Sequence, residues 1–461
     1  MQSLWSKTAA LSSKEELTGD SPLIYDRQVQ NVVIGAGMAG ILTAYFLQKS
    51  GKEVIVLEAG RIAGGQTKNT TAKITSQHGL IYYDMIKKAG KERARGYAMA
   101  NETAIRAYKE IIQKEEISCG FEMLPSFLYS LEEAGKEVLQ REAQAAIALG
   151  LKAYVTERNK QLELPFPVTA QICFEQQAQF HPLEFIEGLS VGLAVYENTN
   201  VLSVKGHKVV TDKGTIIAEN IIFATHYPFI NVPGFYFLRQ HQERSYVLAL
   251  QGEGVPVKLA GMYYGIDKGG LSFRSAEGML LLGGGSHRTG KSVKKPQLPE
   301  GYGYLREMTQ KYYPKAKEIT CWAAQDCMPH DRIPFIGKYS VMRPYWYVAT
   351  GFQKWGMTSS MISAMIISDS ICGRINPYEK IYTPQRILVR AGIKNLFVDL
   401  GESMAGLTKG FLGKKEKRCR HMGCHLVWNE EEKSWDCPCH GSRFDKDGVL
   451  IDNPAQRNLQ H

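Results

Sequence analysis

The stretch NVVIGAGMAGILTAYFLQKSGKEVIVLEAG, residues 31–60, decides the fold of most of this chain. It opens with the short run Asn31–Ile34, which is typical of a buried parallel strand. Gly35–Gly40 then has the pattern GxGxxG, and the residues up to Ser50 have helical spacing with no breaker. A second apolar run, Val54–Leu57, ends at Glu58. Strand, glycine turn, helix, strand and acid in this order predict a dinucleotide-binding βαβ unit.

Each part of this unit has a physical task. Gly35 allows the tight turn, Gly37 lets the backbone approach a pyrophosphate, and Gly40 lets the helix pack closely on the strand. The start of the helix offers free N–H groups and the positive end of a dipole to the phosphates. Glu58 is placed to accept hydrogen bonds from a ribose diol.

Three further segments point to the kind of dinucleotide. Residues 59–67 read AGRIAGGQT, and residues 215–226 read TIIAENIIFATH. Near the end of the same region, DRIPFIG at 331–337 precedes ATGFQKWGMT at 349–358. Together with the glycine turn, these segments resemble the flavoproteins of the D-amino-acid oxidase and glycine oxidase superfamily. The resemblance spans roughly residues 25 to 372, and His226 stands where the family usually has glycine.

The resemblance implies FAD as the cofactor and a helix after Gly351–Gly356 whose N-terminus faces the flavin pyrimidine. Reduced flavin carries negative charge there, and a helix N-terminus stabilises it. The FAD contacts that the resemblance implies are Gly35, Ala36, Gly37, Met38, Ala39, Gly40, Glu58, Ala59, Arg61, Gly65, Gln66, Thr67, Thr71, Val201, Ala224, Thr225, Asp331, Gly351, Gly356, Met357 and Thr358.

The expected fold class is α/β: a Rossmann-like FAD domain interleaved with an antiparallel-sheet substrate domain, plus a small all-β module at the C-terminus. The expected divisions are an N-terminal extension (1–24), the oxidoreductase (25–375), a linker with an amphipathic helix (376–413) and the C-terminal module (414–461). Within the oxidoreductase, we assign the FAD domain residues 25–80, 170–230 and 320–372, and the substrate domain residues 81–169 and 231–319.

The expected chemistry is oxidation of an amine or amino-acid C–N bond. Gly283–Gly285 follows an apolar run but does not open a helix, so the sequence has no second GxGxxG for NADPH. Electrons are therefore expected directly from an organic substrate. Arg274 is the candidate to grip a substrate carboxylate with two hydrogen bonds, and Tyr246 and His287 are weaker candidates. A surface or structural role is the alternative for all three.

Two boxes near the C-terminus carry metal-ligand chemistry. Cys419–Arg420–His421 is followed by Cys437–Pro438–Cys439–His440, and 437 − 421 − 1 = 15 residues separate His421 from Cys437. Two thiolates and two imidazoles at this spacing are the pattern of a Rieske [2Fe–2S] cluster, in which Cys419 and Cys437 hold one iron and His421 and His440 the other. A zinc site with the same ligands and a set of unligated thiols are the alternatives.

The boxes resemble those of the Rieske family, which implies more than the ligands. In its high-potential branch Cys424 and Cys439 form a disulfide, and the hydroxyl of Ser442 bonds a cluster sulfur. Phe444 stands where that branch often has tyrosine. The β-sandwich base of a Rieske domain is abridged here, because the chain runs from the predicted helix at Ile393–Gly413 almost directly into Cys419.

Composition and charge restrict the partners. Residues 374–420 hold 11 Lys/Arg and 4 Asp/Glu, much of the formal net charge of +10. No nucleic-acid-binding module accompanies them, so we favour an acidic protein partner; the basic flanks of the apolar helix would also allow membrane-surface contact, which we favour less. No transmembrane helix or signal peptide is expected, and we predict a cytoplasmic location.

Together, the two cofactor patterns predict an enzyme that passes electrons from flavin to a Rieske cluster and on to an external one-electron acceptor. One alternative is an oxygen-using flavin oxidase whose C-terminal module is vestigial or binds zinc. Another is a redox sensor or binding protein that holds FAD without turnover.

Overall fold

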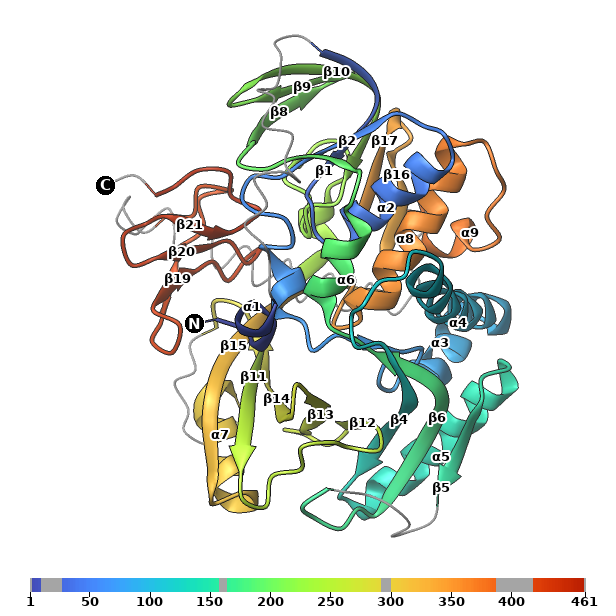
Figure 1. The fold of residues 1–461 in the computed structure, drawn as a ribbon, viewed down its shortest axis with the longest axis vertical. Coiled ribbons are helices and arrows are strands. Elements are labelled where there is room, and N and C mark those ends of the chain that lie inside the picture. The colour runs from blue at the N-terminus through green and yellow to red at the C-terminus, as the bar shows by residue number, and fades with distance from the viewer. Residues whose placement is uncertain (1, 10–26, 157–163, 292–299, 387–417, 460–461) are drawn as a thin grey trace.

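A computed structural model describes residues 2–9, 27–156, 164–291, 300–386 and 418–459. Two large sheets form its body, and a small third sheet, made by the C-terminal residues, lies against one side (Figure 1). Most of the predicted linker, including the amphipathic helix expected at 393–413, lies outside the described residues.

The first sheet is built on the predicted βαβ unit. Its strands are β1 (Arg27–Ile34), β2 (Val54–Leu57), β7 (Ala194–Tyr196), β8 (Val201–Lys205), β9 (Lys208–Thr211), β10 (Gly214–Phe223), β16 (Phe335–Ser340) and β17 (Arg343–Thr350). The order is β16-β17-β10-β1-β2-β7, and the five strands from β17 to β7 run parallel. The buried run Val32–Ile34 explains why β1 lies at the centre, because such a strand needs cover on both faces.

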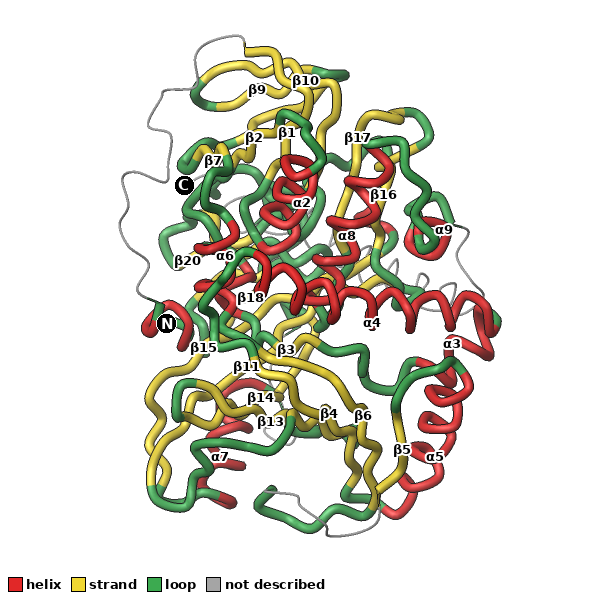
Figure 2. The backbone as a smooth tube through the Cα atoms, turned by 45° about the vertical axis from the view of Figure 1, so that its right-hand side comes forward, coloured by secondary structure: helices red, strands yellow, loops and turns green. Residues whose placement is uncertain are grey.

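Helices cover the first sheet and join it to the second (Figure 2). They are α2 (Met38–Lys49), α4 (Lys91–Lys114), α6 (Pro182–Leu189) and α8 (Gly356–Ile371). Helices α2 and α8 are mostly buried and share one apolar core, which also holds Trp5 of the short helix α1 (Leu4–Thr8). Part of the predicted N-terminal extension therefore packs into the body.

The second sheet is mainly antiparallel, in the order β15-β11-β14-β13-β12-β4-β6-β3, with β5 beside β6. Its strands are β3 (Lys73–Ile74), β4 (Glu122–Ser130), β5 (Ala153–Thr156), β6 (Ala170–Gln179), β11 (Gln240–Gly252), β12 (Met262–Gly265), β13 (Ser272–Ala276), β14 (Met279–Arg288) and β15 (Ala316–Pro329). Helices α3 (Tyr82–Ala89), α5 (Glu133–Ala148) and α7 (Gly301–Tyr312) pack beside it. Strands β3, β6 and β15 were expected in the FAD domain, but they pair within the second sheet, so the two domains share these segments.

The third sheet is an antiparallel meander of four short strands: β18 (Val427–Asn429), β19 (Ser434–Asp436), β20 (Arg443–Asp445) and β21 (Leu450–Asp452). Three short elements complete the description: η1 (Gln66–Asn69), η2 (Tyr236–Leu238) and α9 (Glu379–Tyr382). The predicted fold class, α/β with a small all-β C-terminal module, is confirmed.

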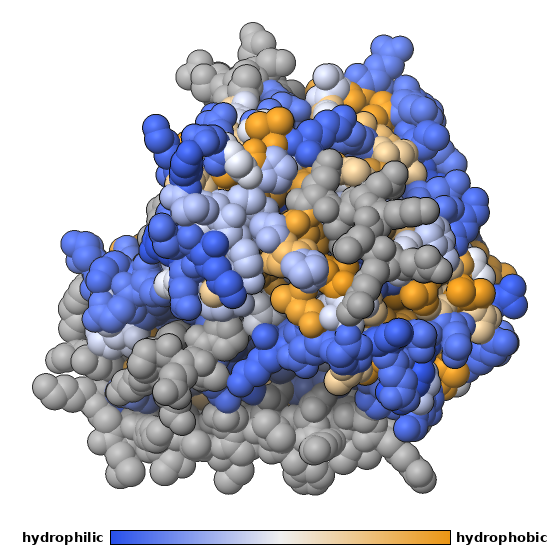
Figure 3. Space-filling view, turned by 90° about the horizontal axis from the view of Figure 1, so that it is seen from below, coloured by the Kyte–Doolittle hydropathy of each residue, from blue (hydrophilic) through white to orange (hydrophobic). Residues whose placement is uncertain are grey.

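On the surface of the described residues, nothing gives a separate indication of a partner. Seen from below, an apolar area adjoins polar side chains (Figure 3), and single exposed apolar residues such as Val155 and Val257 are normal on proteins. None of the helices in the described residues is long and apolar enough to cross a membrane.

Candidate functional site

The glycine turn after β1 has the geometry that a bound pyrophosphate needs. Gly35 has φ +103°, and a Cβ on it would lie 2.6 Å from the carbonyl oxygen of Ala224. A Cβ on Gly40 would overlap the carbonyl oxygen of Gly35. Gly37 caps α2 without a side-chain hydrogen bond, so most N–H groups of the first turn are left for a ligand, although Met38 N donates to Thr67 Oγ1 at 3.0 Å.

Glu58 is held against this turn. Its carboxylate accepts hydrogen bonds from the backbone N–H of Ala36 and of Gly60, each at 2.8 Å. The backbone of Glu58 also pairs with Tyr196 and Thr199, which brings the segment leading to Val201 alongside. The carboxylate therefore lies where the ribose contact was predicted, and the contact itself stays a prediction.

The other family segments meet the turn at the carboxyl ends of the parallel strands. Ala224 N bonds the carbonyl oxygen of Ile34, and the hydroxyl of Thr350 donates to the carbonyl oxygen of His226 at 2.6 Å. His226 has φ +64°, so the histidine keeps the left-handed backbone that the family's glycine would adopt. Ligands of open α/β sheets bind at this end of the strands.

Helix α8 begins as the resemblance implies. Gly356 has open space around it, because a Cβ there would meet nothing within 4 Å. The helix has no side-chain cap at Trp355, and Met357 and Thr358 are buried in its first turn. The uncapped N–H groups fit the anionic pyrimidine of reduced flavin.

Four residues from the predicted FAD set bond to other partners. The buried Asp331 carboxylate pairs with Arg386 at 2.6 Å, and the carbonyl of Thr71 accepts from Arg274. The side chain of Gln66 bridges β15 and the third sheet, and Arg61 pairs with Glu197 at 3.0 Å. These contacts favour structural roles for the side chains of Asp331 and Gln66, whereas Thr71 bonds through its backbone carbonyl and the Arg61 side chain is 69% exposed. Ala59 and Gly65 lie in the same loop, and their contacts with FAD stay a prediction.

The contacts of the three substrate candidates also favour the alternative role. Arg274 is 3% exposed, donates to Gln179 Oε1 at 2.8 Å and to the carbonyl of Phe180 at 2.9 Å, and lies over the ring of Trp5. The hydroxyl of Tyr246 bonds His287 Nε2 at 2.8 Å on the side of β11 that faces the third sheet. A guanidinium occupied by protein acceptors is poorly placed to grip a substrate carboxylate.

Sequence reasoning missed a charged group on the opposite face of β11 and β15. Glu243 and Asp326 are paired across the two strands, and Lys354 Nζ lies 3.4 Å from Glu243 Oε2. Burial raises the pKa of Asp326 to about 6; burial also acts to raise that of Glu243, but bonds to His241 and Lys354 lower it to about 2. The sequence feature that could have indicated this charged group is Lys354, because a lysine lies within the glycine turn before α8.

The two C-terminal boxes fold into matching loops. In the first, Cys419 N bonds Cys424 O and Gly423 N bonds Cys419 O. In the second, Cys437 N bonds Ser442 O and Gly441 N bonds Cys437 O. Gly423 and Gly441 have φ +84° and +83°, so each loop depends on a left-handed glycine at the equivalent point.

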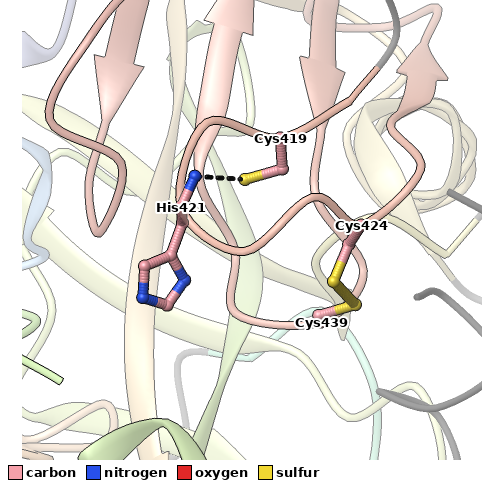
Figure 4. The surroundings of a disulfide bond; sticks show 4 residues. All are labelled: Cys419, His421, Cys424 and Cys439. Atoms are coloured by element: carbon pink, nitrogen blue, oxygen red, sulfur yellow. Dashed lines mark hydrogen bonds between the residues drawn. A yellow bond between two sulfur atoms is a disulfide. The ribbon is translucent and has the colours of Figure 1, made fainter. Parts of the chain in front are cut away.

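The predicted disulfide joins these loops. Cys424 and Cys439 are bonded, with their Cα atoms 6.6 Å apart, and Figure 4 shows the bridge linking the two loops while the ring of His421 points away from it. Sγ atoms of Cys424, Cys437 and Cys439 lie within 4.8 Å of one another. The small core around the boxes consists of the four cysteines of the two boxes together with Leu426, Phe444 and Ala455.

The four predicted ligands lie together and fit a metal cluster. The rings of His421 and His440 are 4.9 Å apart, and His421 Nδ1 is buried with no hydrogen-bond partner among the described residues. Hydrogen bonds from Cys437, from backbone N–H groups and from Ser442 lower the pKa of Cys419 to about 7, towards the thiolate that binds iron. An orphaned imidazole nitrogen beside an activated thiol is what a two-cysteine, two-histidine cluster requires.

The flavoprotein body contacts both imidazole rings, of which His440 is buried and His421 half-buried. His421 Nε2 lies 2.8 Å from Asn231 Oδ1, and the ring of Phe237 meets His440 edge-on at 5.8 Å. His440 is 2% exposed. The flavoprotein loop after β10 covers this side of the boxes, a contact between segments far apart in the sequence that local pattern does not reveal.

Comparison with known proteins identifies both parts of the chain. The FAD dependent oxidoreductase family (DAO) matches residues 31–370, and the Rieske [2Fe-2S] domain family matches residues 409–461. A Bacillus subtilis protein, YhfW, described as a Rieske 2Fe-2S iron-sulfur protein, is 33% identical and aligns over 94% of this chain and 93% of its own length.

Solved structures agree on the fold of the larger part. Glycine oxidase from Geobacillus kaustophilus superposes with a TM-score of 0.65 at 15% identity, covering 78% of this chain and all of its own. L-proline dehydrogenase from P. horikoshii has a TM-score of 0.64 at 19% identity, covering 78% and 98%. The chain belongs to the FAD dependent oxidoreductase (DAO) family and carries a C-terminal Rieske [2Fe–2S] domain.

Proposed function

We propose that this FAD oxidoreductase oxidises an amine or amino-acid-like substrate and passes the electrons through its Rieske cluster to an external one-electron acceptor. Membership of the DAO family supports the first half of the proposal. The similar structures include enzymes named for oxidation of glycine and L-proline, which supports this class of substrate. The net charge of +10 supports an acidic acceptor, and a cytoplasmic location stays a prediction.

One observation carries the second half: the second cluster loop touches the strands that lead to the predicted flavin segments. Gln325 of β15 donates to the carbonyl of Gly441 at 2.8 Å. Cys327 follows two residues after Gln325 on β15. Its Sγ lies 3.5 Å from the carbonyl oxygen of His226, in the turn of the predicted flavin segment. A short stretch of one strand therefore connects the second cluster loop with a predicted flavin segment, which supports the proposed passage of electrons.

The electron balance is simple. Oxidation of an amine C–N bond to an imine releases two electrons and two protons. FAD would supply two-electron chemistry and a Rieske cluster one-electron chemistry, so each substrate oxidised would require two equivalents of a one-electron acceptor. The chain's part is to hold the dinucleotide on the Gly35–Gly40 turn, to place the uncapped start of α8 against the flavin, and to hold the cluster through Cys419, His421, Cys437 and His440.

The proposal is tested on protein purified without air. Absorption should show flavin bands plus broad Rieske features, with two irons per chain, and some member of a panel of amines and amino acids should bleach the flavin. Flavin without iron, or with about one zinc per chain, would support the oxidase alternative. Flavin that none of the panel bleaches would support the sensor.

A further inference from the structure

The Rieske module has little core of its own. In the described residues it consists of two loops and four strands of three residues each, and its buried apolar cluster contains four cysteines and three other side chains. A unit of about 40 residues rarely buries enough surface to be stable alone. One disulfide links its loops. Further support has to come from the flavoprotein body.

The body supplies a pair of buried amides to the second cluster loop. Gln242 of β11 donates to the carbonyl of His440 at 2.7 Å, and Gln325 of β15 donates to the carbonyl of Gly441 at 2.8 Å. Each glutamine is 1% exposed, and Gln325 also donates to Gln242 Oε1, so the two amides fix each other's orientation. A Cβ on Gly441 would lie 2.7 Å from the Cβ of Gln242, which shows how closely loop and sheet approach.

Strand geometry explains why these residues share a face. Side chains alternate along a strand, so Gln242 and Arg244 point to one side of β11 and Glu243 to the other. The antiparallel register pairs Arg244 with Gln325, which brings the side chain of Gln325 to the same side. The β11–β15 pair therefore presents polar side chains to the cluster loop on one face and the Glu243–Asp326–Lys354 group on the other.

An ionic cluster fixes the orientation of the module. Glu432 bonds Arg244 of β11 and lies 3.0 Å from Arg443 of β20. Arg443 also pairs with Asp436 at 3.0 Å and with Asp452 at 3.1 Å. Buried pairs of this kind are better evidence for one specified arrangement than for net stability, because desolvation offsets much of their attraction.

Two more contacts hold the remaining loop and the end of the module. Asn231 Oδ1 accepts a hydrogen bond from His421 Nε2 at 2.8 Å, which leaves the other ring nitrogen, Nδ1, for the metal. Asn453 donates to the carbonyls of Thr225 at 2.7 Å and Tyr227 at 2.9 Å. Outer partners of this type orient metal-ligating histidines.

We propose that the flavoprotein body serves as the missing half of the Rieske fold, with Gln242, Gln325 and Asn231 as positioning residues for the cluster. The cluster works at a fixed place, and its histidine edges face the body, so an external acceptor approaches from another side. The way the body holds the cluster does not depend on the route of the electrons.

The test uses the full chain with Gln242→Met and Gln325→Met combined. Methionine keeps the length of the side chain but removes both donors to the loop carbonyls. The matched control is Gln240→Met, a 2% exposed glutamine on the same face of β11 that bonds Thr350 within the body. The measurements are flavin content, iron and sulfide per chain, the electron paramagnetic resonance spectrum after dithionite, and amide hydrogen exchange of residues 437–442.

The double variant should keep its flavin, lose iron relative to the control, and exchange the amides of 437–442 at least tenfold faster. Equal iron content, an equal spectrum and equal exchange in the double variant and the control would overturn the proposal. If the double variant does not fold, Asn231→Ala tests the same proposal. This change leaves the glutamines intact and should shift the spectrum and speed exchange around His421, and an unchanged spectrum and exchange would contradict the proposal.

Discussion

Removal of the Glu432 carboxylate should loosen the Rieske module severely. Arg244 and Glu432 have side chains that are 2% and 10% exposed, and Arg443, beside them, is 5% exposed. In Glu432→Ala, Arg443 keeps Asp436 and Asp452, but Arg244 loses its ion pair with Glu432 and stays close to a second buried cation. Breaking a buried pair from one side costs about 3–5 kcal/mol, so a loss of that size is expected.

Urea unfolding, followed by tryptophan fluorescence with excess FAD, measures this loss. Trp428 and Trp435 report directly, because their rings lie 5.0 Å apart within the module. The matched control is Glu430→Ala, since the side chains of Glu430 and Lys433 are 74% and 68% exposed and such exposed pairs contribute little to stability.

A second variant separates charge from packing. Arg244→Met combined with Glu432→Met removes both charges, and it should recover most of the stability lost in Glu432→Ala, because replacing a whole buried pair by apolar side chains is often neutral. The reasoning is refuted if Glu432→Ala unfolds within about 1 kcal/mol of Glu430→Ala, or if the double variant is less stable than Glu432→Ala.

Three other predictions concern the cofactor sites. Glu58→Ala should weaken FAD binding by about 1–3 kcal/mol, because the ribose hydroxyls would be left without their predicted acceptor. Equilibrium titration of the apoprotein measures the affinity, and an unchanged affinity would remove the ribose assignment. Burial raises the pKa of Asp326 to about 6, so the folded state favours the protonated carboxyl and the protein loses stability as pH rises from about 4 to 6. In urea unfolding, Asp326→Asn should therefore be more stable than the parent by about 1–3 kcal/mol at pH 8 and by little at pH 4, and a difference that does not change with pH would count against the raised pKa. Ser442→Ala removes a hydrogen bond to the Cys419 sulfur and should lower the cluster potential by roughly 60 mV, the equivalent of about 1.4 kcal/mol for one electron, in a redox titration, whereas an unchanged potential would exclude that bond.

The sequence was most informative where chemistry is local. The Gly35–Gly40 turn, Glu58 and the paired Cys–His boxes each occupy a short segment whose residue types are dictated by one backbone geometry or one ligand set. The same holds for the Cys424–Cys439 bridge, which followed from the family resemblance and is present in the structure. Such features could be predicted before any tertiary contact was known.

Contacts between distant segments could not be predicted in this way. Arg274 was a reasonable carboxylate ligand by residue type, yet the fold brings it against Gln179, Phe180 and Trp5. Tyr246 and His287 face the Rieske module because of strand alternation in β11 and β14, which depends on a register that the sequence alone does not specify. The covered histidine edges likewise depend on a loop about 190 residues away.

The most direct test of the account is rapid mixing of the oxidised protein with a bleaching substrate in the absence of oxygen. Absorption follows the flavin, and freeze-quenched electron paramagnetic resonance follows the cluster. If the cluster is fixed beside the flavin segments, its reduction should follow flavin bleaching at a rate that does not depend on protein concentration. A cluster that stays oxidised while the flavin bleaches, or a rate proportional to protein concentration, would contradict the account.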